Sequence, residues 1–208
     1  NAVDAAITAG LVQGVVDPQM CGIAGFGSCQ IYMPSSDTHV SIDFHGKTPL
    51  AATPDMWADL VEGETRDGFG FIVRGNVNDI GYQSITTPGS LMAYWEAVER
   101  FGSRSWAEAC RPAIEHASDG IVLRPRTTSW WRMTEQLGRV ANEKRQGFTE
   151  DGRRIYYGND GELLNEGQTL RNPDMARTLE RVAAGGAEVF YQGEIADEID
   201  ADMRANGG

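Results

Sequence analysis

Residues 30–49 read QIYMPSSDTHVSIDFHGKTP, and this stretch decides the fold class. Residues 30–33 and 39–44 are two short runs whose apolar and polar side chains alternate as they do in half-buried strands. The PSSD between them is typical of a turn. The pattern therefore predicts a β-hairpin whose second strand leads directly into a histidine, a glycine and a lysine.

Most of the remaining sequence predicts helices that would cover this hairpin. Alanine-rich or amphipathic helical patterns occupy residues 1–16, 90–102, 105–120, 172–186 and 194–208. We expect a shorter helix within residues 49–60, capped by Thr53, and mostly helical structure over residues 127–148. A hairpin and many covering helices predict an α+β fold, which we treat as a single domain over residues 1–208.

The charge composition excludes several classes of partner. The chain has 30 Asp and Glu against 18 Lys and Arg, a formal net charge of −12. Such a field repels nucleic acid and anionic membrane surfaces, and no apolar run approaches the roughly 18–20 residues of a membrane span. We therefore expect no nucleic-acid partner and no membrane partner.

Motifs for cofactors, metals and catalysis are weak. The glycine cluster CGIAGFG (residues 21–27) lacks the Gly-Lys-Ser/Thr ending of a phosphate loop and precedes a strand, so close packing at a turn is favoured. The carboxylate-rich stretches are typical of solvated faces. No serine, cysteine or threonine can be matched to a base. We expect no cofactor, no metal and no catalytic residue within this chain.

The cysteines and the chain ends bear on location and processing. The chain has three cysteines, Cys21, Cys29 and Cys110, and none of them has CxxC spacing. This pattern favours free, partly buried thiols, with a Cys21–Cys29 disulfide as the alternative. Free thiols favour the cytoplasm, with a periplasmic or secreted location as the alternative. Both ends fall within helical patterns, so we expect a fragment or one product of a processed precursor.

The bases that follow the hairpin, His45 and Lys47, allow two interpretations. They are either solvated charges at a strand end, which local pattern alone favours, or they flank Gly46 in an anion-binding site.

Four collinear stretches resemble the large subunit of the γ-glutamyltranspeptidase family, a branch of the N-terminal-nucleophile hydrolases. They are NAVDAAITAGLVQGVVDPQMCGIAGFG, DFHGKTPLAATPDMW, the segment from TPGSLMAYW to IVLRP, and the segment from NPDMARTL to the last glycines. The resemblance spans most of the chain and is least distinctive over residues 121–170. It implies an αββα four-layer sandwich, with this chain as a large-subunit part.

The resemblance also implies an autoprocessed precursor. In the family, a threonine that becomes the N-terminus of the small subunit attacks the substrate carbonyl, and its own amine acts as the base. No residue of this chain matches that threonine, so the nucleophile and the oxyanion-hole glycines are expected on a partner chain. The implied assembly is a heterodimer with its own small subunit, paired into a dimer of heterodimers, that acts on a small-molecule amide.

One departure from the family changes the expected substrate. Where the family carries Arg-Glu-x-Ala-Pro, whose arginine holds the α-carboxylate of the glutamyl group, this chain has His45, Gly46, Lys47, Thr48 and Pro49. Loss of the forked guanidinium should weaken carboxylate recognition by ~1.5–3 kcal/mol. We therefore expect amidohydrolase activity on a small amide. Its acyl group would be small and oxalyl-like or of keto-acid type, or the amide would lack the α-carboxylate.

Two alternatives remain. The protein could act on glutathione-like γ-glutamyl donors with Lys47 in the place of the arginine, although residues 45 and 47 share a strand face only if the strand continues through Gly46. It could also be a non-catalytic homologue that binds a ligand or serves as a scaffold.

Overall fold

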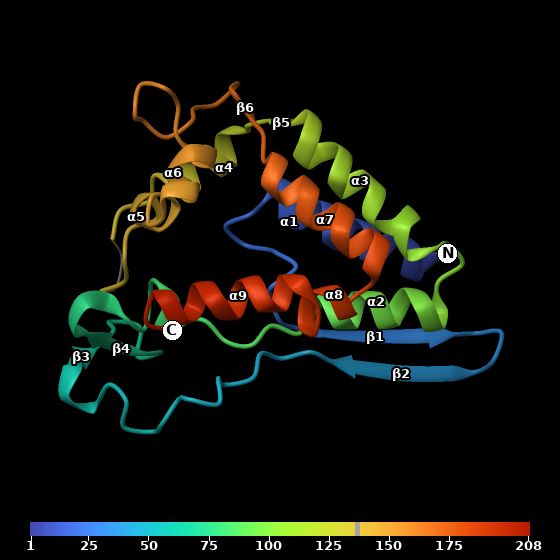
Figure 1. Ribbon diagram of the computed structural model, residues 1–208, viewed down its shortest axis with the longest axis horizontal. Coiled ribbons are helices and arrows are strands. Elements are labelled where there is room, and N and C mark those ends of the chain that lie inside the picture. Colours follow the sequence, from blue (N-terminus) through green and yellow to red (C-terminus); the bar gives the residue numbers. More distant parts are fainter. Residues whose placement is uncertain (136–137) are drawn as a thin grey trace. The chain divides into compact units, whose positions relative to one another are not determined.

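A computed structural model describes residues 1–135 and 138–208 of the chain (Figure 1). The chain divides into two compact units, each built from separated segments. The first unit holds Asn1–Thr48, Thr86–Ile121 and Arg171–Asp200, and the second holds Pro49–Ile85, Val122–Leu170 and Ala201–Gly208. The hairpin and the polar strand end both belong to the first unit. That residues 1–208 act as one domain together with a small subunit stays a prediction.

The predicted hairpin is confirmed. Strand β1 (Ser28–Met33) pairs antiparallel with β2 (Thr38–Asp43). Ile31 and Ile42 are buried, while Gln30 and Tyr32 are exposed, which is the alternation expected of a sheet with one covered face. In the turn, Asp37 has a φ of 47°, a left-handed conformation that aspartate tolerates better than most residues.

Helices of the first unit begin at the caps that the sequence provides. Ser105 and Asn172 accept hydrogen bonds from backbone amides in the first turns of α3 and α7, and Pro173 occupies the first position of α7. The helices are α1 (Ala2–Val16), α2 (Ser90–Phe101), α3 (Trp106–Asp119), α7 (Pro173–Gly185) and α8 (Glu188–Tyr191), and α9 (Glu194–Ala205) begins here and ends in the second unit.

The core of the first unit combines these helices with one face of the hairpin. Helix α3 packs against α1 and α7, and α2 contacts α1 and α3 (Figure 1). Leu11, Leu91 and Leu179 are fully buried, and Ile31 and Ile42 of the hairpin join the same apolar cluster. Burial of this apolar surface fixes the hairpin relative to the helices of the unit.

The second unit contains shorter elements. Strand β3 (Val61–Glu64) pairs antiparallel with β4 (Phe71–Val73), with a register shift between Val61 and Gly63. Trp131 is fully buried, and its ring packs edge to face against Tyr156 with centroids 5.4 Å apart. The remaining elements of the chain are α4 (Pro125–Trp131), α5 (Asn142–Gln146), α6 (Glu150–Tyr156), β5 (Ile121–Val122), β6 (Thr169–Leu170) and the 3-10 turns Ala58–Leu60, Arg74–Asn76 and Tyr82–Ser84.

Two helical predictions are wrong in part. The helix expected within residues 49–60 is only the 3-10 turn Ala58–Leu60, because residues 53–56 are exposed and have no apolar face to bury. Within residues 127–148, helix ends at Trp131 and resumes at Asn142. Gly138 has a φ of 88°, which a right-handed helix cannot accommodate. Residues 136 and 137 of that predicted helix lie outside the described residues.

Over residues 1–135 and 138–208, no helix has the length and apolar character needed to cross a membrane.

Candidate functional site

Three backbone segments meet where β2 ends, and they form the candidate site. The N–H of Phe44 donates to the carbonyl of Gly27 at 3.0 Å, and the N–H of Gly27 donates back to Phe44 at 3.3 Å. Lys47 and Thr87 exchange hydrogen bonds in the same way, at 3.0 and 2.8 Å. The strand end is therefore held both by the glycine turn and by the segment that precedes α2.

The glycine cluster contributes close packing to this arrangement. The carbonyl of Gly25 accepts the N–H groups of Gly89 at 3.0 Å and Ser90 at 3.2 Å. These amides at the start of α2 are thus partnered within the protein, so they are not available to a phosphate. A Cβ at Gly89 would lie 2.6 Å from the carbonyl oxygen of Phe44, so only glycine fits there. The geometry supports the packing interpretation of CGIAGFG.

His45 lies at the surface and is bound to a neighbouring carboxylate. Its side chain is 66% exposed, and its Nδ1 lies 2.7 Å from Oδ1 of Asp43. The backbone N–H of His45 donates to the same oxygen at 3.1 Å. Two hydrogen bonds from His45 lower the pKa of Asp43. The larger effect comes from the imidazole and the smaller from the backbone N–H. Because Nδ1 is engaged, a ligand meets only Nε2 of His45.

Lys47 differs from His45 because its charge is not paired. No carboxylate oxygen of the described residues lies within 4 Å of its ammonium, and the side chain is exposed. Strand β2 ends at Asp43, and Lys47 belongs to an isolated bridge. The continuous strand through Gly46 that would place residues 45 and 47 on one face is therefore not formed. Lys47 offers a cation that is free to contact a ligand anion.

Gly46 is required by a close approach to another segment. A Cβ at this position would lie 2.3 Å from Oγ1 and 3.0 Å from Cβ of Thr86. The space that a side chain at position 46 would occupy is thus filled by Thr86. His45, Gly46 and Lys47 are adjacent in the chain, and that they form one binding site stays a prediction. Gly46 lets the backbone approach Thr86 and offers no polar side chain of its own.

Sequence reasoning missed two members of this site, Asp43 and Thr86. The spacing of Asp43 and His45 was a usable signal, because an aspartate two residues earlier commonly accepts from the backbone N–H of the later residue. No local signal could have revealed Thr86, because its contact with Gly46 depends on tertiary pairing of distant segments.

The cysteines do not form a disulfide in this structure. Cys21 and Cys29 are half-buried and Cys110 is fully buried, and all three are free, as predicted. Burial raises the pKa of Cys110 to about 12, so this thiol is inert as a nucleophile at neutral pH. Among the residues that the structure describes, no group of three His, Cys, Asp or Glu side chains could hold a metal ion.

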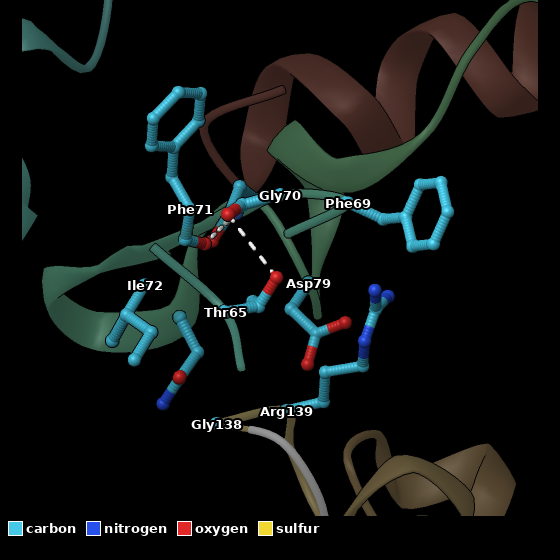
Figure 2. A pocket seen from close by; sticks show the side chains of 10 residues that line it. Thr65, Phe69, Gly70, Phe71, Ile72, Asp79, Gly138 and Arg139 are labelled. Carbon is cyan, nitrogen blue, oxygen red and sulfur yellow. Dashed lines mark hydrogen bonds between the residues drawn. The ribbon is translucent and has the colours of Figure 1, made fainter. Parts of the chain in front are cut away.

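The second unit contains a pocket of about 170 Å³, shown in Figure 2. Its charged groups already have partners within the protein. Asp79 accepts from Nη2 of Arg145 at 2.6 Å and from the N–H of Val140 at 2.7 Å, and Arg139 donates to Asp67 at 2.9 Å. This pocket therefore offers a ligand little charge. It is lined by Thr65, Phe69, Gly70, Phe71, Ile72, Asn76, Asn78, Asp79, Gly138 and Arg139.

Comparison with known proteins gives consistent matches over the whole chain. The family model described as Gamma-glutamyltranspeptidase matches residues 1–208. Acylase ACY 1 proenzyme of Pseudomonas sp. (strain V22) is 32% identical over 210 residues, which covers 100% of this chain and 35% of that protein. Glutathione hydrolase proenzyme of Pseudomonas sp. (strain A14) is 31% identical over 209 residues, which covers 100% of this chain and 33% of that protein. The crystal structure of Helicobacter pylori γ-glutamyltranspeptidase matches with a TM-score of 0.84 at 26% identity, covering 100% of this chain and 54% of that one.

The chain thus spans about a third of the length of these curated relatives. The structural match confirms the α+β fold of the N-terminal-nucleophile hydrolase type that the sequence predicts.

Proposed function

The chain belongs to the γ-glutamyltranspeptidase family, and we propose that it is part of the large subunit of an amidohydrolase that cleaves a small amide. The observation that carries the proposal is the strand end at residues 45–47. It holds an unpaired lysine and a carboxylate-bound histidine where the family's pattern has a substrate-clamping arginine.

The geometry argues against a tight fit for a glutamyl α-carboxylate. A guanidinium can bind a carboxylate through two parallel hydrogen bonds, whereas His45 has one ring nitrogen left after its contact with Asp43. The loss of ~1.5–3 kcal/mol expected for a charge-assisted hydrogen bond corresponds to roughly 10- to 150-fold in affinity. A smaller acyl anion that needs only the point charge of Lys47 fits this arrangement better.

The proposed reaction places the bond-making group on the partner chain. An N-terminal threonine of the small subunit adds through its hydroxyl oxygen to the amide carbonyl, and the hydroxyl proton passes to that residue's amine. The C–N bond then breaks and the leaving amine takes the proton. Water hydrolyses the resulting ester, which frees the acid and the threonine. With oxamate as the amide, oxamate and water give oxalate and ammonium.

Processing of the complete precursor tests whether the protein is an enzyme of this type. We expect the purified protein to run as two chains, and sequencing should find threonine at the N-terminus of the smaller chain. An uncleaved precursor, or a small chain without an N-terminal Thr, Ser or Cys, would instead support the ligand-binding or scaffold interpretation.

The unpaired ammonium of Lys47 also favours a second candidate, γ-glutamyl transfer or hydrolysis with Lys47 as the carboxylate anchor. This reading predicts that Lys47→Met in the processed enzyme raises KM for a γ-glutamyl donor by roughly tenfold or more while kcat changes little. Lys144→Met is a matched control, because Lys144 is exposed on α5 in the second unit. An unchanged KM for the Lys47 variant would remove this candidate.

A further inference from the structure

The face of the hairpin that lies away from the apolar cluster carries an exposed aromatic ring next to His45. Strands β1 and β2 pair Ser28 with Asp43. The backbone hydrogen bonds at the end of β2 extend this pairing by one residue on each strand, so Phe26 lies opposite His45. Because side chains alternate between the two faces of a sheet, these four side chains lie together on one face.

Three of these side chains form a connected cluster. The ring centroids of Phe26 and His45 lie 5.9 Å apart, with ring planes at 34°, and Nδ1 of His45 lies 2.7 Å from Oδ1 of Asp43. Phe26 is 66% exposed, and the side chain of Asp43 is 76% exposed. Ser28, the residue opposite Asp43, is small and leaves the carboxylate uncovered. The imidazole therefore joins an open aromatic ring to an open carboxylate.

The open atoms of this cluster accept hydrogen bonds. Both hydrogen bonds from His45 to Asp43 end on Oδ1, so Oδ2 has no hydrogen-bond partner among the residues that the structure describes. In the neutral imidazole, a hydrogen on Nδ1 that faces the carboxylate leaves the lone pair on Nε2. The face of the Phe26 ring is the negative part of its quadrupole. All three groups favour a ligand that donates hydrogen bonds and carries a positive charge.

An anion fits this face poorly. It would meet the negative charge of Asp43, and the formal net charge of the chain, −12, attracts cations and repels anions at longer range. An exposed carboxylate by itself binds a cation weakly. The ring of Phe26 adds a cation–π contact and apolar area, which an inorganic cation with its tightly held water cannot use as well. The ring and the carboxylate together therefore select an organic ammonium group.

We propose that Phe26, Asp43 and His45 form a binding site for an organic ammonium group, whose place in the reaction rests on the function proposed above. Oδ2 of Asp43 and Nε2 of His45 accept hydrogen bonds from the ammonium, and its carbon-bearing part packs on the ring of Phe26. The proposed acyl anion is held by Lys47, and an oxalyl group has no amine of its own. The ammonium therefore belongs to the amine half of the substrate, so amides of diamines are the favoured class.

Binding to the complete processed protein tests this site without relying on turnover. Benzylammonium and phenylacetate, a cation and an anion of similar size, are titrated by calorimetry, and we expect the wild type to bind benzylammonium more tightly. Asp43→Asn keeps the shape of the side chain and removes its charge, and Phe26→Ala removes the ring. Each variant should raise the Kd for benzylammonium about threefold or more. Phe26→Leu, which keeps apolar bulk but lacks the aromatic face, replaces the alanine variant if that variant does not fold.

Tyr32→Ala is the matched control for the loss of an exposed ring. Tyr32 lies on the same face of β1 at its other end and is similarly exposed. It also has a histidine neighbour, because its ring centroid lies 5.6 Å from that of His39. This variant should bind benzylammonium as the wild type does. Melting temperatures show whether each variant is folded.

Three results would each overturn the inference. They are no binding of benzylammonium by the wild type, binding of phenylacetate that is equally tight or tighter, and a Kd for benzylammonium that Asp43→Asn and Phe26→Ala leave unchanged. Binding that depends on Phe26 and Asp43 in a protein that hydrolyses no amide would leave the ammonium site standing and overturn the proposed function alone. Hydrolysis of oxamate without such binding would leave the proposed function standing and overturn the ammonium site.

Discussion

The substitution Gly46→Ala should destabilise the strand end, because the new methyl group would overlap Thr86. The added carbon would lie 2.3 Å from Oγ1 and 3.0 Å from Cβ of Thr86, whereas non-bonded carbons pack at about 3.5–4.0 Å. Rotation about χ1 moves the hydroxyl of Thr86 but leaves its Cβ in place. The backbone of one segment must therefore shift by several tenths of an ångström.

The expected cost follows from these two overlaps. Overpacking typically costs about 1–3 kcal/mol. Because the hydroxyl is exposed and can leave its preferred rotamer for about 0.5–1.5 kcal/mol, we expect the lower part of that range. For a domain of this size, about 1–2 kcal/mol corresponds to a fall of about 2–8 °C in Tm.

Thermal melting of the processed protein by circular dichroism measures the effect. Gly63→Ala is the matched control, because a Cβ at Gly63 has no atom within 4 Å, and its Tm should stay within about 2 °C of the wild type. In a Thr86→Gly background the cost of Gly46→Ala should largely disappear, since the clashing side chain is absent. An equal loss of Tm in both backgrounds would refute the contact on which this reasoning depends.

Two further predictions concern stability and pH. Leu179→Ala removes a fully buried side chain from α7 and should lower the free energy of unfolding by about 2–5 kcal/mol, seen as a lower Tm; an unchanged Tm would contradict the core described for the first unit. The pKa of Asp67 is lowered from 3.8 to about 2. The largest cause is the hydrogen bond from the Thr65 hydroxyl, and the Phe69 amide and Arg139 contribute less. This interaction stabilises the folded state above about pH 4 and is lost as pH falls through 2, so Asp67→Asn should show a smaller drop in Tm below pH 4 than the wild type.

Most of the first unit could be predicted because its signals are local. Alternating side chains predicted the hairpin. The helical patterns over residues 105–120 and 172–186 predicted α3 and α7, which begin at Trp106 and Pro173. The helix expected after Thr53 does not form, because a capping residue followed by Pro54 does not make a helix without an apolar face. Gly138 interrupts the expected helix because its φ is positive. A glycine in the sequence permits a positive φ but does not by itself predict one.

The candidate site was predictable only in part, for a physical reason. His45, Gly46 and Lys47 are adjacent in the chain, so the sequence places them together. The state of His45 depends on its bond to Asp43, and the fit of Gly46 depends on Thr86, forty residues away in the chain. Which charges are paired and which side chain fills a space are properties of the folded contacts, and a pattern of residue types does not contain them.

The substrate preference of the complete processed enzyme tests the central claim most directly. The measurement is kcat/KM for oxamate and for γ-glutamyl-p-nitroanilide under the same conditions. A strand end with His45 and Lys47 in place of an arginine fork predicts a higher kcat/KM for oxamate. Robust turnover of the glutamyl substrate with none of oxamate would contradict the account.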